Sequence, residues 1–145
     1  VLIHMGQLEE PDLRRLFETH KNLYAMTSHA DPYSAGKGGK PFVNIIDGDR
    51  LKPQWRQMMI DYPDRFIFAL DNVFGTFWTP KAYLGKMRLW WSVASDLPAE
   101  VAHAWAHGNA ERLWKLQPRH EGMIHPNEAM RALGPVTGHA PEKTR

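Results

Sequence analysis

Three short runs of consecutive apolar residues constrain the fold of this chain more than any other feature. They occupy residues 1–3, 23–26 and 66–70, and none of them alternates with polar residues. Continuous apolar strands are typical of parallel sheets, in which helices cover both faces. The runs therefore predict three buried parallel strands.

The segments between these runs have the spacing of amphipathic helices. A proline stands near the start of each segment, at Pro11 and at Pro53, where the first turn of a helix tolerates it. Apolar residues then recur at i, i+3 and i+4 intervals: Leu13, Leu16 and Phe17 in the first segment, and Trp55, Met58 and Met59 in the second. The alternation of strand and helix predicts an α/β fold with a parallel sheet.

Helices are predicted to dominate the rest of the ordered chain. One candidate covers residues 80–93, a second begins at Pro98, and Asn109 is the predicted N-cap of a last helix that ends near Leu116. From residue 117 onward the composition shifts to proline, glycine, histidine and charged residues. We therefore expect one domain over residues 1–116 and an irregular tail over residues 117–145.

The composition limits which classes of molecule the chain is expected to bind. The 145 residues are 43% hydrophobic and 23% charged, as in an ordinary globular domain. A formal charge of +2 gives no support for nucleic-acid binding. No apolar run approaches the roughly 18 residues of a membrane-spanning helix, so no membrane partner is expected. The chain has no cysteine, which excludes thiolate metal ligands and agrees with a cytoplasmic location.

Two of the predicted strands end in residues that can carry chemistry. His4 follows the first apolar run and Asp71 follows the third. The carboxyl ends of parallel strands share one rim, where a carboxylate needs a partner or a metal and a histidine can bind a metal or transfer a proton. The alternatives are a hydrogen-bonded structural histidine and an aspartate that caps the next segment. His29 and Asn72, in the adjoining loops, are predicted to contact a substrate.

Five segments resemble successive landmarks of the amidohydrolase-related family: Ile3–Gly6, Tyr62–Phe66, Ala69–Asp71, Leu97–Ala102 and Gly108–Trp114. The resemblance implies the C-terminal portion, about strands six to eight, of a (β/α)8 TIM barrel followed by C-terminal helices. It implies a divalent metal ion, most often zinc, and a metal-activated water that hydrolyses a small amide, ester or lactone. Decarboxylation on the same scaffold and a non-catalytic fragment are the alternatives.

The resemblance also implies roles for particular residues. His4 matches a strand-six histidine that assists catalysis or binds a second metal, and Asp71 matches a strand-eight aspartate that binds the metal and accepts a proton from water. The family's paired histidines on strand one and its ligand on strand five have no counterpart here. Because a catalytic zinc usually has three protein ligands, we expect the isolated chain to be inactive. It would need the missing N-terminal barrel half or a homo-oligomeric partner.

A second pair of histidines has a spacing that can chelate zinc. His103 and His107 stand four residues apart on a predicted helix. The zinc-protease motif requires glutamate after the first histidine, and this chain has Ala104 there. The pair is therefore predicted to lie on an ordinary helix face.

Overall fold

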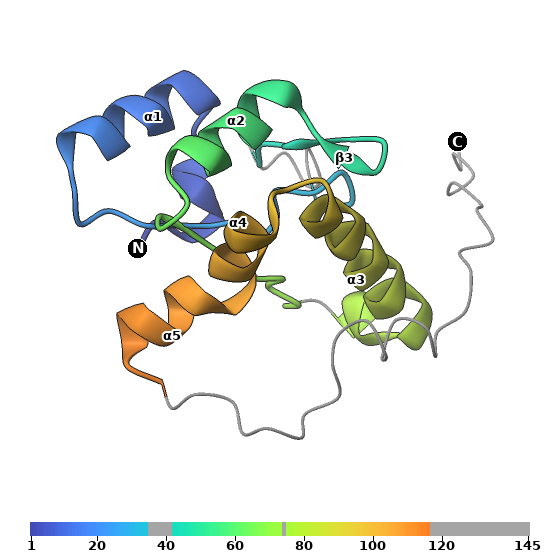
Figure 1. Cartoon of the computed structure of the whole chain (residues 1–145). Coiled ribbons are helices and arrows are strands. Elements are labelled where there is room, and N and C mark those ends of the chain that lie inside the picture. The colour runs from blue at the N-terminus through green and yellow to red at the C-terminus, as the bar shows by residue number, and fades with distance from the viewer. Residues whose placement is uncertain (35–41, 74, 117–145) are drawn as a thin grey trace.

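A computed structural model describes residues 1–34, 42–73 and 75–116 of the chain (Figure 1). The irregular tail predicted for residues 117–145 lies outside the described residues. The helices are α1 (Glu10–Thr19), α2 (Pro53–Asp61), α3 (Pro80–Ser95), α4 (Ala99–His103) and α5 (Asn109–Trp114). Shorter turns are the 3-10 segments η1 (Ile3–Gln7) and η3 (Gly75–Trp78) and the π-helical turn η4 (Ala104–Gly108).

The strands in the described part are short and form two small sheets. β1 (Ala25–Met26) pairs in parallel with β4 (Phe66–Ile67), and β2 (Ile46–Asp47) pairs antiparallel with β3 (Arg50–Leu51). Leu2 adds one isolated parallel bridge to Ala25. The three apolar runs thus lie beside one another in parallel, but their regular pairing is limited to a few residues.

The predicted portion of a TIM barrel, about strands six to eight, is wrong. Helices and helical turns together form more than half of the described chain, and each strand is two residues long. Val1 and Ile3, in the first predicted strand, are 51% and 60% exposed. The amide of Phe68 donates to the carbonyl of Trp105 at 3.0 Å, so η4 occupies the place where the next strand of a barrel would pair. The described residues therefore do not form part of a barrel sheet.

The first two helices begin and pack as their sequence spacing predicts. Each carries a proline in its first turn, and α1 also has acidic residues there, which suits the positive end of the helix dipole. The buried residues are Leu13 and Phe17 in α1, and Trp55, Met58 and Met59 in α2. The two helices lie side by side along one edge of the molecule (Figure 1).

The last three helical elements follow one another without a break from Ala99 to Trp114. Asn109 is not the predicted N-cap, because it has helical backbone angles and is itself the first residue of α5, directly after η4; its side chain is buried. Its amide nitrogen donates to the carbonyls of Pro63 and Phe66, both at 2.8 Å. Asn109 therefore fastens this helical arm to β4.

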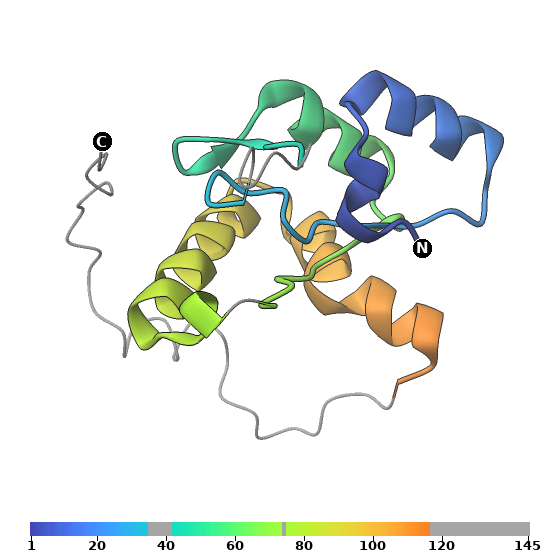
Figure 2. The same cartoon turned by 180° about the vertical axis from the view of Figure 1, so that it is seen from behind.

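In the described residues, the side chains of one hydrophobic core pack around the short parallel segments, which lie between the helices in Figure 2. The rings of Phe68, Trp90 and Trp105 contact one another in pairs, with centroids 5.2–5.9 Å apart. Trp105 also donates its indole N–H to the hydroxyl of Thr27 at 3.2 Å. The core thus anchors the chain just after β1 and just after β4, where the candidate site lies.

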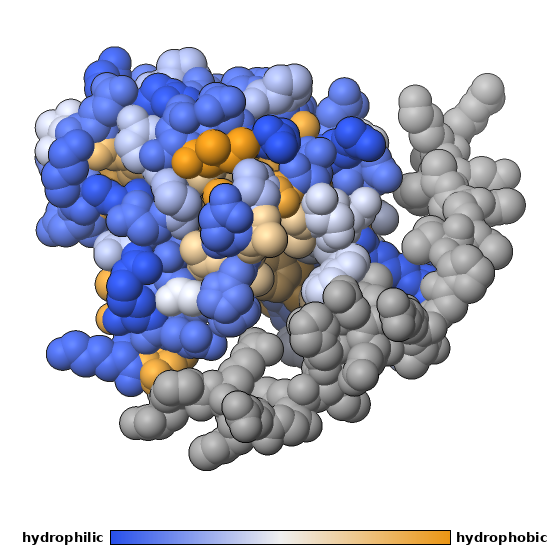
Figure 3. Space-filling view, viewed as in Figure 1, coloured by the Kyte–Doolittle hydropathy of each residue, from blue (hydrophilic) through white to orange (hydrophobic). Residues whose placement is uncertain are grey.

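The outer surface is mainly polar on the face that Figure 3 shows, with its hydrophobic residues gathered in limited patches. Among the helices of the described residues, each is too short or too polar to cross a bilayer.

Candidate metal centre

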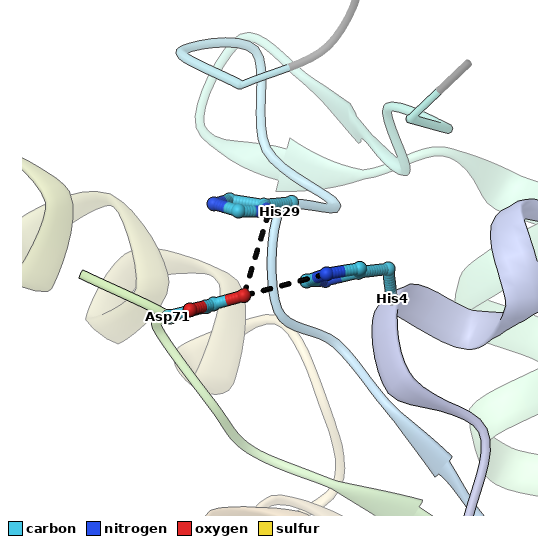
Figure 4. A group of neighbouring side chains, drawn as sticks. All are labelled: His4, His29 and Asp71. Carbon is cyan, nitrogen blue, oxygen red and sulfur yellow. Dashed lines mark ion pairs between the residues drawn. The ribbon is translucent and has the colours of Figure 1, made fainter. Parts of the chain in front are cut away.

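His4, His29 and Asp71 converge at the ends of the three parallel segments (Figure 4). His4 lies in η1, His29 in the loop after β1, and Asp71 in the loop after β4. Nε2 of His4 is 3.4 Å from Oδ2 of Asp71, and Nδ1 of His29 is 3.7 Å from the same oxygen. All three ligand atoms lie within 4.8 Å of one another. The structure thus brings His4 and Asp71 together as predicted, at the ends of paired segments but without a barrel.

These separations suit a metal ion better than direct hydrogen bonds. A charge-assisted N–H to carboxylate bond is about 2.7–2.9 Å long, and both histidine contacts with Asp71 are longer. Ligands about 2.0–2.2 Å from a tetrahedral zinc ion lie roughly 3.3–3.6 Å from one another. The contacts of His4 and His29 with Asp71 are close to that spacing, whereas the limit that covers all three ligand atoms, 4.8 Å, is wider.

The backbone at all three residues is in the left-handed region. The φ angles are 54° at His4, 59° at His29 and 51° at Asp71. Non-glycine residues there cost on the order of 1–3 kcal/mol each, and they persist only where the surroundings hold them. In this chain the strained conformations turn three side chains toward one point.

Ser28 orients the ring of His4. Nδ1 of His4 lies 2.9 Å from the hydroxyl and 3.3 Å from the carbonyl of Ser28, and the His4 backbone N–H donates to the same hydroxyl at 3.3 Å. When Nδ1 carries the ring proton, it donates to Ser28 and leaves the lone pair of Nε2 directed at Asp71. Metal-binding histidines are typically held in this way through their other nitrogen.

His29 is the most buried member of the cluster, with 6% of the residue exposed. Its Nδ1 is buried and has no hydrogen-bond partner among the described residues. Burial lowers the pKa of the imidazole below its ordinary value, and the nearby carboxylate of Asp71 opposes this only in part. The neutral ring, which is the form that binds metals, is therefore favoured.

Aromatic contacts limit how the two imidazoles can move. The rings of His4 and His29 are stacked, with centroids 4.6 Å apart and planes 25° apart. Phe42 contacts both rings, at centroid distances of 5.1 Å and 4.6 Å. In contrast, the Asp71 side chain is 29% exposed, so the cluster has a side that a small molecule can approach.

The structure alters the expected role of one residue and adds two others. His29 was predicted to contact a substrate, and the structure places its Nδ1 with the potential metal ligands instead. Asn72, the other predicted substrate contact, is adjacent to Asp71, and its buried Oδ1 has no hydrogen-bond partner in the described ranges. Ser28 and Phe42 were not predicted. His29 follows a buried apolar run, as His4 and Asp71 do. This shared position is the sequence signal that could have identified His29 as a third ligand.

Comparison of the chain with protein-family models, with curated proteins and with solved structures found no match. The chemistry of the centre therefore rests on its own donor atoms. Two imidazole nitrogens and one carboxylate oxygen form a donor set that suits zinc and related first-row divalent ions. Magnesium and calcium prefer oxygen ligands throughout.

Proposed function

We propose that His4, His29 and Asp71 bind one divalent metal ion, zinc by preference, and that the chain is a metal-dependent hydrolase of a small amide, ester or lactone. The observation that carries this proposal is the spacing of the three ligand atoms, all within 4.8 Å. Three protein ligands are typical of catalytic zinc sites, which keep one position for water, whereas structural sites usually have four.

The donor groups around the centre have complementary tasks. A zinc ion bound by these three residues would lower the pKa of a coordinated water molecule to about 7. The carboxylate of Asp71 is partly exposed, and a carboxylate in that position is able to accept a proton as a general base. Ser28 holds the ring of His4 in one orientation, and Phe42 contacts both imidazole rings.

The third ligand changes what is expected of the chain by itself. The expectation of an inactive fragment counted only His4 and Asp71 as ligands. With His29, the described residues provide the number that catalytic zinc sites normally have. We therefore propose that residues 1–145 bind zinc without another chain.

Zinc titration of the metal-free chain tests the proposal. We expect one ion per chain, and metal-dependent cleavage in a panel of small aryl esters, amides and lactones. The matched control is Glu111→Gln, which removes a carboxylate that contacts a histidine outside the cluster. Absence of zinc binding would refute the proposed centre. Binding without turnover would make the chain a metal-binding module, and release of carbon dioxide from an aromatic acid would make it a lyase.

A further inference from the structure

A buried ion pair joins α3 to the loop that carries His29. Nζ of Lys86, in α3, is 3.2 Å from Oδ2 of Asp31, and the two side chains are 4% and 0% exposed. Oδ2 makes no hydrogen bond among the described residues, so charge alone pairs it with the ammonium. A buried ion pair rarely stabilises a fold more than apolar side chains of similar volume do. Stability alone therefore gives little reason for this pair.

The ammonium group of Lys86 connects the loops that carry two of the proposed ligands. It donates to the carbonyl of Leu70 at 3.3 Å, and Leu70 directly precedes Asp71. Its other partner, Asp31, lies two residues after His29. One side chain from α3 thus contacts the chain immediately before one ligand and shortly after another.

Asp31 also accepts hydrogen bonds from the backbone of its own loop. Its Oδ1 accepts hydrogen bonds from the amides of Tyr33 and Ser34, at 2.9 Å and 3.0 Å. His29 and Asp71 both have left-handed backbones, so the directions of their side chains depend on how the flanking residues are held. Lys86 contacts the residue before Asp71 and, through Asp31, the segment after His29.

We propose that Lys86 is a positioning residue that sets the distance between His29 and Asp71, and through it the affinity of the centre for zinc. This inference rests on the proposed metal centre. Lys86 itself has no place among the ligands, because its ammonium binds Asp31 and Leu70 and lies 4.8 Å from the ring centroid of Phe77.

The test compares Lys86→Met with the double variant Lys86→Met/Asp31→Asn in the full chain. The single variant leaves a buried carboxylate unpaired, which threatens folding. The double variant is neutral at both positions, and the amide oxygen that Asp31→Asn introduces can still accept the loop hydrogen bonds. Lys81→Met removes an exposed lysine from the same helix and is the control.

Three measurements separate positioning from a purely structural role. We expect the double variant to keep the parent's melting temperature, to bind zinc about 10–100-fold more weakly, and to give an altered visible spectrum with cobalt. In the metal-free chain, the ring resonances of His29 should shift in this variant and not in Lys81→Met. Unchanged zinc affinity, cobalt spectrum and His29 resonances would overturn the inference.

The metal-free spectrum also keeps the two proposals apart. A parent chain that binds no zinc, with His29 resonances that still respond to the double variant, refutes the metal centre and the effect of Lys86 on zinc affinity, but supports the role of Lys86 in setting the distance between His29 and Asp71. A parent that binds zinc, with a double variant of equal affinity, supports the metal centre and refutes the positioning role.

Discussion

Two sets of two histidines and one carboxylate in the described residues differ in how they are built. The helical set is His103, His107 and Glu111, spaced four residues apart along the last helical arm. The loop set is His4, His29 and Asp71, drawn from segments far apart in the sequence. Among the described residues, only the loop set brings three ligand atoms within 4.8 Å of one another.

The members of the helical set contact one another directly. Nδ1 of His107 lies 3.0 Å from a carboxylate oxygen of Glu111, which is an ordinary hydrogen bond, and the rings of His103 and His107 meet edge to face with centroids 4.2 Å apart. The loop set has longer separations, held by strained backbones. A helical spacing that can chelate a metal is therefore weaker evidence for a site than ligand atoms from distant segments that converge at distances longer than a hydrogen bond.

Among the changes proposed here, Asp71→Asn in the loop set should have the largest effect on zinc affinity and on hydrolytic rate. This change keeps the shape of the side chain and removes its charge and basicity. Zinc affinity should fall by more than the roughly 10–100-fold that loss of a supporting contact costs, and any hydrolytic rate should fall by about 10²–10⁴-fold. Glu111→Gln, measured by the same titration and assay, should match the parent. Equal losses of zinc affinity in Asp71→Asn and Glu111→Gln would show that the loop set is no more a metal site than the helical set.

A smaller effect is expected from Ser28→Ala. The hydroxyl contacts Nδ1 of His4 at 2.9 Å, and the backbone carbonyl of the same residue remains at 3.3 Å as a substitute partner. The zinc dissociation constant should therefore rise by about tenfold, at the low end of the range for such contacts. Competition with a chromophoric chelator measures it. An unchanged constant would show that Ser28 has no part in orienting the ring.

The pH dependence of stability should depend on His29. Burial lowers its pKa in the folded chain, while an unfolded chain has a histidine pKa of about 6.5. The unfolded state therefore takes up the proton first, and the metal-free fold loses stability as pH falls from about 6.5 through the lower folded pKa. Each unit of lowering corresponds to about 1.4 kcal/mol. Denaturant unfolding of His29→Asn between these pH values should show a shallower dependence; a slope equal to the parent's would contradict the assignment.

The smallest effect is expected from His107→Gln. The side chain is partly exposed and its contact with Glu111 spans one helical turn. Surface pairs of this kind contribute about 0.3–0.5 kcal/mol, so the free energy of unfolding should change by no more than that, with zinc affinity unaltered. A loss of zinc affinity here would mean that the helical set takes part in metal binding.

Residues 1–116 divide into features that were predictable and features that were not. The spacing of Leu13 and Phe17 identified a helix face that is indeed buried in α1, because that pattern depends only on the helical repeat. The run at 66–70 was predicted to be a strand, yet only Phe66–Ile67 pairs. Whether a buried apolar segment extends as a strand depends on its neighbour, and here Trp105 accepts the hydrogen bond of Phe68.

The same limit applies to the site. His4 and Asp71 were predictable candidates because each ends an apolar run, and the runs lie side by side in parallel. The sequence by itself determined these local properties: helix faces, buried runs and the polar residues that follow them. Only the tertiary structure decided that His29 is a third potential ligand, that Ser28 orients His4, and that Lys86 contacts both loops. These are contacts between segments distant in the chain, and their geometry is set by packing and by strained backbone angles that no local pattern specifies.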